Sequence, residues 1–334
     1  MFYKYIFSLL ILSSSFTLFG QELPYTFQFV NVGEYQPLTN ATTVDTNGPW
    51  DDPVLEIPIG FEVAMFGESF DTFYLNGYIG GFLMSSNTES SMLAPYGEDL
   101  TDRGYGTEQS MSPILYKVDG QAPGRIFKIE WQNAGFYNEV AFGSSESYVN
   151  FQLWIYETAG LIEYCYGPSN IASNDVFGNG SGPSIGLLQS ANVQTFEIGN
   201  SWFLTGESTD PVISPSEANP VTFPSLNQTP PVGQIYAFYP TNVSAVESEE
   251  LAVGVQIYPN PVVNQLTLEL DLSATPDQLE ARIFNTLGQQ VYFQSLGQST
   301  ESLLTVDVEQ LPKGSYIVQV RDGQAQISKR IIKQ

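Results

Sequence analysis

The side chains able to do chemistry in this 334-residue chain are mostly carboxylates and aromatic rings, because histidine is absent and there is one cysteine. The lack of histidine excludes Ser-His-Asp triads, Cys-His dyads, HExxH zinc sites and histidine general bases. No GxSxG motif, P-loop or GxGxxG at a strand-to-helix turn is present. A hydrolase would therefore need a carboxylate pair, as in glycosidases. The candidates in the aromatic-rich centre are Glu130, Glu139, Glu157 and Glu163.

Four glutamates in this region are no more than chance supplies, because the segment 22–240 carries 25 acidic residues. The sequence therefore favours a protein that is not an enzyme. A secreted carbohydrate-active hydrolase is the alternative.

The segment VDTNGPWDD offers oxygen ligands on a loop with glycine and proline, which suits calcium. The candidate metal ligands are Asp45, Asn47, Asp51 and Asp52. Their spacing does not match an EF-hand, and a solvated acidic turn is the alternative. Calcium is the one cofactor that the sequence suggests.

Two strand-like runs, 148–157 and 161–167, could form a ligand-contact surface. In the first, Val149, Phe151, Leu153 and Ile155 share one face, so Tyr148, Trp154 and Tyr156 share the other with Asn150 and Gln152. Pairing Ile155 with Ile162 keeps the apolar faces together and places Trp154 opposite Glu163. Flat rings beside amides and carboxylates suit a sugar ring. A covering loop or second layer would bury this face instead.

Charge is distributed unevenly along the chain. Residues 22–240 carry four basic and 25 acidic side chains, a net charge of −21. Nucleic acid and anionic membrane surfaces would repel such a domain. Divalent cations, cationic partners and neutral sugars remain as ligands. Cys165 lies in a strand-like run, where a buried thiol is expected.

The chain divides into four segments. Residues 1–20 have the charged start, apolar run and small residues of a secretory signal peptide, and no later segment is apolar enough to span a membrane. Residues 21–240 alternate strand-like runs with turn residues, which predicts an all-β, sandwich-like cargo domain. Residues 241–253 predict a linker. Residues 254–334 show period-two alternation throughout, so we expect a small immunoglobulin-like β-sandwich.

In that last segment, Tyr316, Val318 and Val320 should face the core, leaving Ile317, Gln319 and Arg321 on a mostly solvated face.

The motifs YPNPV, IFNTLGQQV and LPKGSYIVQV, followed by a lysine-rich final strand, resemble the type A C-terminal sorting domain of the type IX secretion system of Bacteroidetes. The family pattern falls on Tyr258, Pro259, Asn260, Pro261, Asn285, Gly288, Gly314, Tyr316, Lys329 and Lys333. The resemblance implies recognition by the type IX translocon, removal of the domain by its sortase-like protease, and often attachment of the cargo to surface lipopolysaccharide. The linker is the processing region that it implies.

Residues 21–240 are similar to the extracellular nidogen-like domain in their aromatic and turn patterning, as in GRIFKIEWQNAGFY and YVNFQLWIYETAGLIEYCYG. This resemblance implies a β-rich domain of adhesion and matrix proteins, and it carries no catalytic residue. We therefore expect a secreted or cell-surface protein whose cargo domain adheres to a glycan or matrix protein. A structural envelope component is a further alternative.

Overall fold

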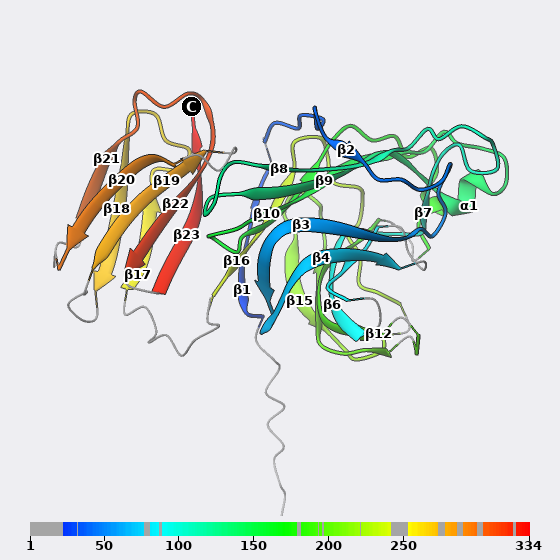
Figure 1. Cartoon of the computed structure of the whole chain (residues 1–334), viewed down its shortest axis with the longest axis horizontal. Helices are drawn as coiled ribbons and strands as arrows, with labels where there is room; N and C mark the ends of the chain where they lie inside the picture. Colours follow the sequence, from blue (N-terminus) through cyan, green and yellow to red (C-terminus); the bar gives the residue numbers. More distant parts are fainter. Residues whose placement is uncertain are drawn as a thin grey trace, which may run out of the picture.

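The chain folds into two β-rich units, shown by a computed structural model of the protein (Figure 1). The structure describes residues 23–31, 33–76, 81–86, 89–178, 182–192, 194–195, 197–220, 222–241, 253–272, 278–285, 290–298, 303–322 and 325–334. The predicted signal peptide at 1–20 and nearly all of the predicted linker lie outside these residues. Among the residues described, no helix is long and apolar enough to cross a membrane.

The cargo domain consists of two antiparallel sheets packed face to face. The first has the order β1-β16-β11-β10-β9-β8-β2, with β7 added beside β9. Its strands are β1 (Tyr25–Val30), β2 (Thr42–Thr43), β7 (Leu100–Thr101), β8 (Ile114–Asp119), β9 (Ile126–Phe136), β10 (Val149–Tyr156), β11 (Ile162–Tyr166) and β16 (Ile235–Pro240).

The second sheet has the order β15-β14-β12-β6-β5-β4-β3, with β13 beside β12. Its strands are β3 (Val54–Met65), β4 (Glu68–Asn76), β5 (Leu83–Met84), β6 (Glu89–Gly97), β12 (Ser184–Asn192), β13 (Glu197–Ile198), β14 (Ser201–Thr205) and β15 (Val212–Ser216). Helix α1 (Tyr137–Val140) and a 3₁₀ turn, η1 (Asn174–Val176), are the helical elements of the described residues.

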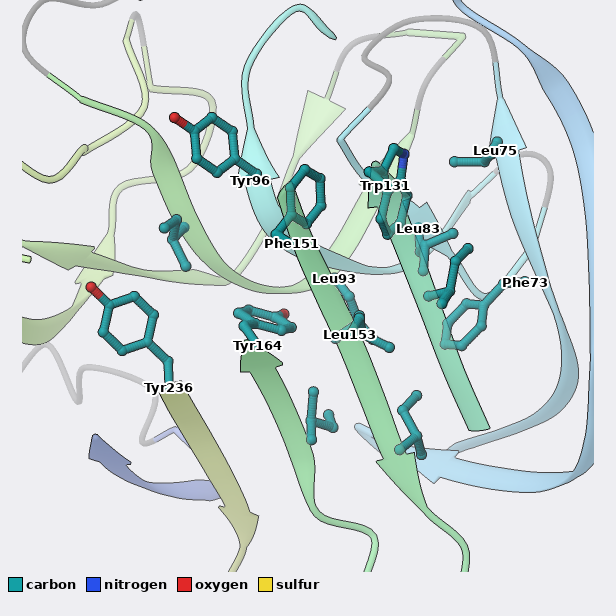
Figure 2. Packing of buried hydrophobic residues seen from close by; sticks show 14 of the residues in the cluster. Phe73, Leu75, Leu83, Leu93, Tyr96, Trp131, Phe151, Leu153, Tyr164 and Tyr236 are labelled. Carbon is teal, nitrogen blue, oxygen red and sulfur yellow. The ribbon is translucent and has the colours of Figure 1, made fainter. Parts of the chain in front are cut away.

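Large aromatic side chains fill the space between the two sheets, as Figure 2 shows. Phe151 on β10 stacks on Trp131 of β9, with ring centroids 4.8 Å apart. It also stacks on Tyr96 of β6 in the opposite sheet, at 5.4 Å. Phe151 therefore connects the two layers, and its apolar face is the one that strand alternation predicts.

The C-terminal unit is a smaller sandwich with its own core. One sheet has the order β17-β18-β21 and the other β20-β19-β22-β23. The strands are β17 (Val253–Tyr258), β18 (Gln265–Leu272), β19 (Leu279–Asn285), β20 (Gln290–Gly297), β21 (Leu303–Asp307), β22 (Gly314–Asp322) and β23 (Ala325–Lys333). The predicted fold class, an all-β cargo domain followed by a small β-sandwich, is confirmed.

We expect Phe151→Ala to lower the free energy of unfolding of the cargo domain by about 3–5 kcal/mol, because it leaves a cavity between the sheets. Phe142→Ala is the matched control, since the Phe142 side chain is 88% exposed and its loss should change stability by less than about 0.5 kcal/mol. Urea unfolding followed by tryptophan fluorescence measures both. Equal unfolding midpoints for the two variants would contradict this account of the core.

Candidate functional site

The outer face of β9, β10, β11 and β16 carries part of the polar and aromatic set singled out from the sequence, namely Glu130, Trp154, Tyr156 and Glu163. β10 and β11 pair in the predicted register, with Ile155 opposite Ile162 and Trp154 opposite Glu163. Their apolar residues point into the core of the sandwich. Trp154 and Glu163 therefore lie side by side on the opposite face.

The C-terminal unit covers part of this face. Tyr156, Leu161 and Tyr239 of the cargo domain form one apolar cluster with Ile317 of β22, and Phe284 of β19 packs against it. The expectation of a mostly solvated face on β22 is wrong at this point, because both Ile317 and Gln319 are buried. Alternation separates the two faces of a strand correctly, but the second face here packs against the other domain instead of contacting water.

A buried ion pair lies beside this cluster. The guanidinium of Arg330 on β23 is 3.1 Å from Oε1 of Glu163, and their side chains are only 6% and 1% exposed. The hydroxyl of Tyr156 donates to Oε2 of Glu163 at 2.9 Å, and the Arg330 backbone N–H donates to the Tyr239 hydroxyl at 2.8 Å. Burial is the largest effect on the pKa of Arg330 and lowers it, but Glu163 and the neighbouring acidic groups together outweigh burial, so the net pKa is raised. Arg330 therefore keeps its positive charge beside the Glu163 carboxylate.

A cleft of about 780 Å³ continues from the ion pair along the seam between the two units. Lys128 lies on its wall, with Nζ 4.0 Å from the centroid of the Trp154 ring and 3.0 Å from Oδ2 of Asp119. Burial is the largest effect on the pKa of Asp119 and raises it, but the hydrogen bonds and charges of Lys117 and Lys128 together outweigh burial, so the pKa is lowered. Burial lowers the pKa of Lys128, against the opposing effect of Asp119. The cleft is therefore lined by paired charges beside an aromatic ring.

The three predicted ligand-contact residues do not form one surface. Trp154 and Tyr156 are neighbours, with ring centroids 6.5 Å apart. Tyr156 is buried beneath the C-terminal unit, so no ligand reaches it in the intact chain. Tyr148 forms a bridge with Asn170, and its ring lies under the guanidinium of Arg103. An early loop also covers Gln152, whose side-chain amide donates to the Gln36 carbonyl at 2.8 Å.

All four candidate catalytic glutamates have contacts that hold the fold together. Besides Glu163, Glu130 accepts hydrogen bonds from the Tyr35 hydroxyl and the Leu38 backbone N–H. Glu157 pairs with Arg125 at 2.5 Å. Glu139 accepts hydrogen bonds from backbone N–H groups in the loop that follows α1.

Two of the four predicted metal ligands meet a third acidic residue. Asp51, Asp52 and Asp99 each offer an oxygen, and these oxygens lie within 4.8 Å of one another. Asp45, another predicted ligand, is not part of this group and accepts a hydrogen bond from the backbone N–H of Asn47, the fourth predicted ligand, at 3.0 Å. Trp50 lies between the two pairs in the sequence, and its buried indole N–H donates to the Ser112 carbonyl.

This acidic group carries mutual repulsion. Burial raises the pKa of Asp99 to about 6, with a further contribution from the charges of Asp52 and Asp51. The pKa values of Asp51 and Asp52 are raised as well, mainly by burial. Nothing in the spacing of the sequence pointed to Asp99, which lies 47 residues after Asp52 and comes close through the bridge between Asp51 and Thr101.

The residues of the sorting pattern lie around the last strand. The side chain of Asn260 donates to the Arg330 carbonyl at 3.0 Å and accepts from the Ile332 backbone at 2.8 Å. Asn285 pairs with Tyr316, whose hydroxyl donates to the Pro312 carbonyl. Tyr258 is the last residue of β17, and Pro259 and Pro261 flank Asn260. Gly314 is the first residue of β22, and Lys329 and Lys333 lie on β23. Gly288 is outside the described residues.

Arg330 is the residue of the site that sequence reasoning missed. It follows a lysine of the sorting pattern, and strand alternation places it on the face opposite Ile331. The only hint in the sequence was a basic residue directly before two isoleucines on this strand. The acidic excess of the cargo domain could have supplied the partner.

Comparison with known proteins gives two family matches. Residues 24–240 match the family described as NIDO related, and residues 256–334 match the secretion system C-terminal sorting domain. Both predicted resemblances are thereby confirmed. A search of curated proteins found no match.

Two solved structures show weak similarity to the chain. A DUF3244 family protein with an immunoglobulin-like β-sandwich fold from Bacteroides vulgatus is 15% identical, with a TM-score of 0.21, over 24% of this chain and 84% of that chain. The dimeric latent PorU from Porphyromonas gingivalis is 9% identical, with a TM-score of 0.21, over 85% of this chain and 29% of that chain.

We expect Asp99→Asn to stabilise the protein at pH 7.5 by less than about 1 kcal/mol, because Asp99 is solvent-accessible and screening reduces the effect. Because the pKa of Asp99 is raised in the folded protein, its contribution to stability is fully present at pH values below 3.8, the pKa in the unfolded chain. This contribution is lost as the pH rises through about 6, the pKa in the folded protein. The difference in melting temperature between variant and wild type should therefore disappear near pH 4. Asp45→Asn is the matched control, and a similar gain there, or a gain independent of pH, would contradict this explanation.

Proposed function

The chain belongs to the NIDO-related family, and from this premise we propose that it is a non-catalytic adhesion protein delivered to the cell exterior. Its C-terminal sorting domain directs export by the type IX secretion system, and this domain is the observation that carries the proposal. We further propose that the chain is cleaved between residues 241 and 253, and that the cargo is then released or anchored to surface lipopolysaccharide.

The cargo domain supports binding more than catalysis. The chain lacks histidine, and its four central glutamates have structural contacts. The cleft beside Trp154, lined by Lys128 and Asp119, suits recognition of a matrix protein or glycan. The net charge of −21 on residues 22–240 favours partners that are cationic or neutral.

The export step is tested in a host with a type IX system, by following the mass of the surface product. We expect the full chain to appear at the surface shortened near residues 241–253, and a chain truncated before Val255 to stay in the periplasm. Asn260→Ala should reduce the surface product, because the last strand loses two hydrogen bonds. Asn264→Ala is the matched control, since its side chain is exposed. Equal export of the full and truncated chains would overturn the sorting role.

The adhesion step is tested with cells that export the chain and cells that carry the truncated form. We expect the exporting cells to be retained on surfaces coated with matrix protein or glycan at several times the level of the truncated strain. Equal retention on every coating would refute adhesion and leave export unaffected.

A further inference from the structure

The face shared by the two domains contains a carboxylate whose cationic partner comes from the other domain. Glu163 is on β11 of the cargo domain, while Arg330 is on the last strand of the sorting domain. If the sorting domain leaves after export, Glu163 loses that partner. Removing one member of a buried pair is costly while the other stays buried, so an exposed Glu163 would favour a new cation.

The groups around Glu163 suit a guanidinium or ammonium ion. Tyr156 donates a hydrogen bond that fixes one carboxylate oxygen, which leaves the other to face the cation. Trp154 lies directly across the strand pair from Glu163, and its ring already attracts one cation, since Nζ of Lys128 lies 4.0 Å from the ring centroid. Lys128 is close by, but Asp119 pairs with it at 3.0 Å.

We propose that Glu163, Tyr156 and Trp154 form a binding site for an arginine or lysine side chain of a partner protein, and that Arg330 occupies this site until the sorting domain is removed. This inference rests on the proposed function, because it needs export and removal of that domain. The sorting domain thus keeps the adhesive face closed inside the producing cell.

The interface has a feature that favours separation. Gln319 is fully buried against the cargo domain, and neither atom of its side-chain amide has a hydrogen-bond partner among the described residues. A buried amide without partners weakens the contact that contains it. The docking of the two domains therefore depends more strongly on the ion pair.

Cys165 provides a built-in probe of this closure in the intact chain. It is the single cysteine, it is buried, and it lies on the wall of the cleft with Arg330. Burial raises the pKa of its thiol, so the docked chain should react slowly with iodoacetamide. The rate of alkylation, followed by mass spectrometry, then measures how often the face opens.

In the intact chain, we expect Arg330→Ala to increase the alkylation rate about tenfold or more. Ethylguanidinium at millimolar concentration should return the rate toward that of the wild type by refilling the site, whereas neutral ethylurea should not. Gln319→Leu should slow the reaction, because it keeps the ion pair and removes the unpartnered amide. Arg282→Ala is the matched control, since Arg282 pairs with Glu280 inside the sorting domain. An unchanged rate in Arg330→Ala, or equal effects of ethylguanidinium and ethylurea, would overturn the proposal.

Ligand binding is tested on a full chain with a protease site inserted within residues 242–252. After cleavage we expect an arginine-containing peptide to bind at least about tenfold more tightly than to the uncut chain. The same peptide with citrulline, which is neutral, should not gain affinity, and Glu163→Gln should remove the gain. Equal binding before and after cleavage, or in Glu163→Gln, would refute the site.

The outcomes separate this inference from the proposed function. If exporting cells adhere and Glu163→Gln cells adhere equally well, the adhesion role stands and the cation site fails. If the cleaved chain binds the arginine peptide through Glu163 but cells do not adhere, the site stands and the adhesion role fails.

Discussion

The contact between the two domains depends on one buried ion pair, Glu163 with Arg330. Both side chains are almost inaccessible to water, so each needs the other to offset the loss of hydration. This requirement fixes the position of β23 against the cargo sheet. Because β23 is also the last strand of the small sandwich, the same strand completes one domain and covers a face of the other. Asn260 strengthens this arrangement by binding the backbone on both sides of Ile331.

The cargo domain is strongly acidic, which explains why the partner of Glu163 comes from the other domain. Four basic side chains stand against 25 acidic ones in residues 22–240, and two of the four, Lys117 and Lys128, pair with Asp119. The domain therefore has few cations of its own to place beside a buried carboxylate. The carboxyl groups of Asp51, Asp52 and Asp99 lie together, and their pKa values are raised. Glu163 is instead paired with Arg330 of the sorting domain.

Strand alternation predicted the local features of the fold and could not predict what covers them. The pairing of Trp154 with Glu163 followed from keeping two apolar faces together, and the structure has that register. The same reasoning placed Ile317 and Gln319 on a solvated face, where they are in fact buried. A period of two assigns residues to faces, but contacts between domains depend on tertiary geometry that no local pattern encodes. For the same reason, Asp99 was missed while Asp51 and Asp52 were singled out.

On the proposal that the sorting domain is removed after export, its contact with the cargo domain must be strong enough to cover that face and weak enough to separate. Apolar contacts such as Ile317 with Tyr156 supply attraction without a demand for specific partners. The ion pair supplies specificity, since misplacing either charge leaves the other buried alone. Gln319 weakens the docking of the two domains, because its side-chain amide loses hydration without gaining a hydrogen bond among the described residues. The unpaired Gln319 amide lowers the stability of the interface. The two domains stay docked as long as the covalent linker keeps the two faces at high effective concentration. Cutting the linker removes that advantage, and the unsatisfied amide then favours separation.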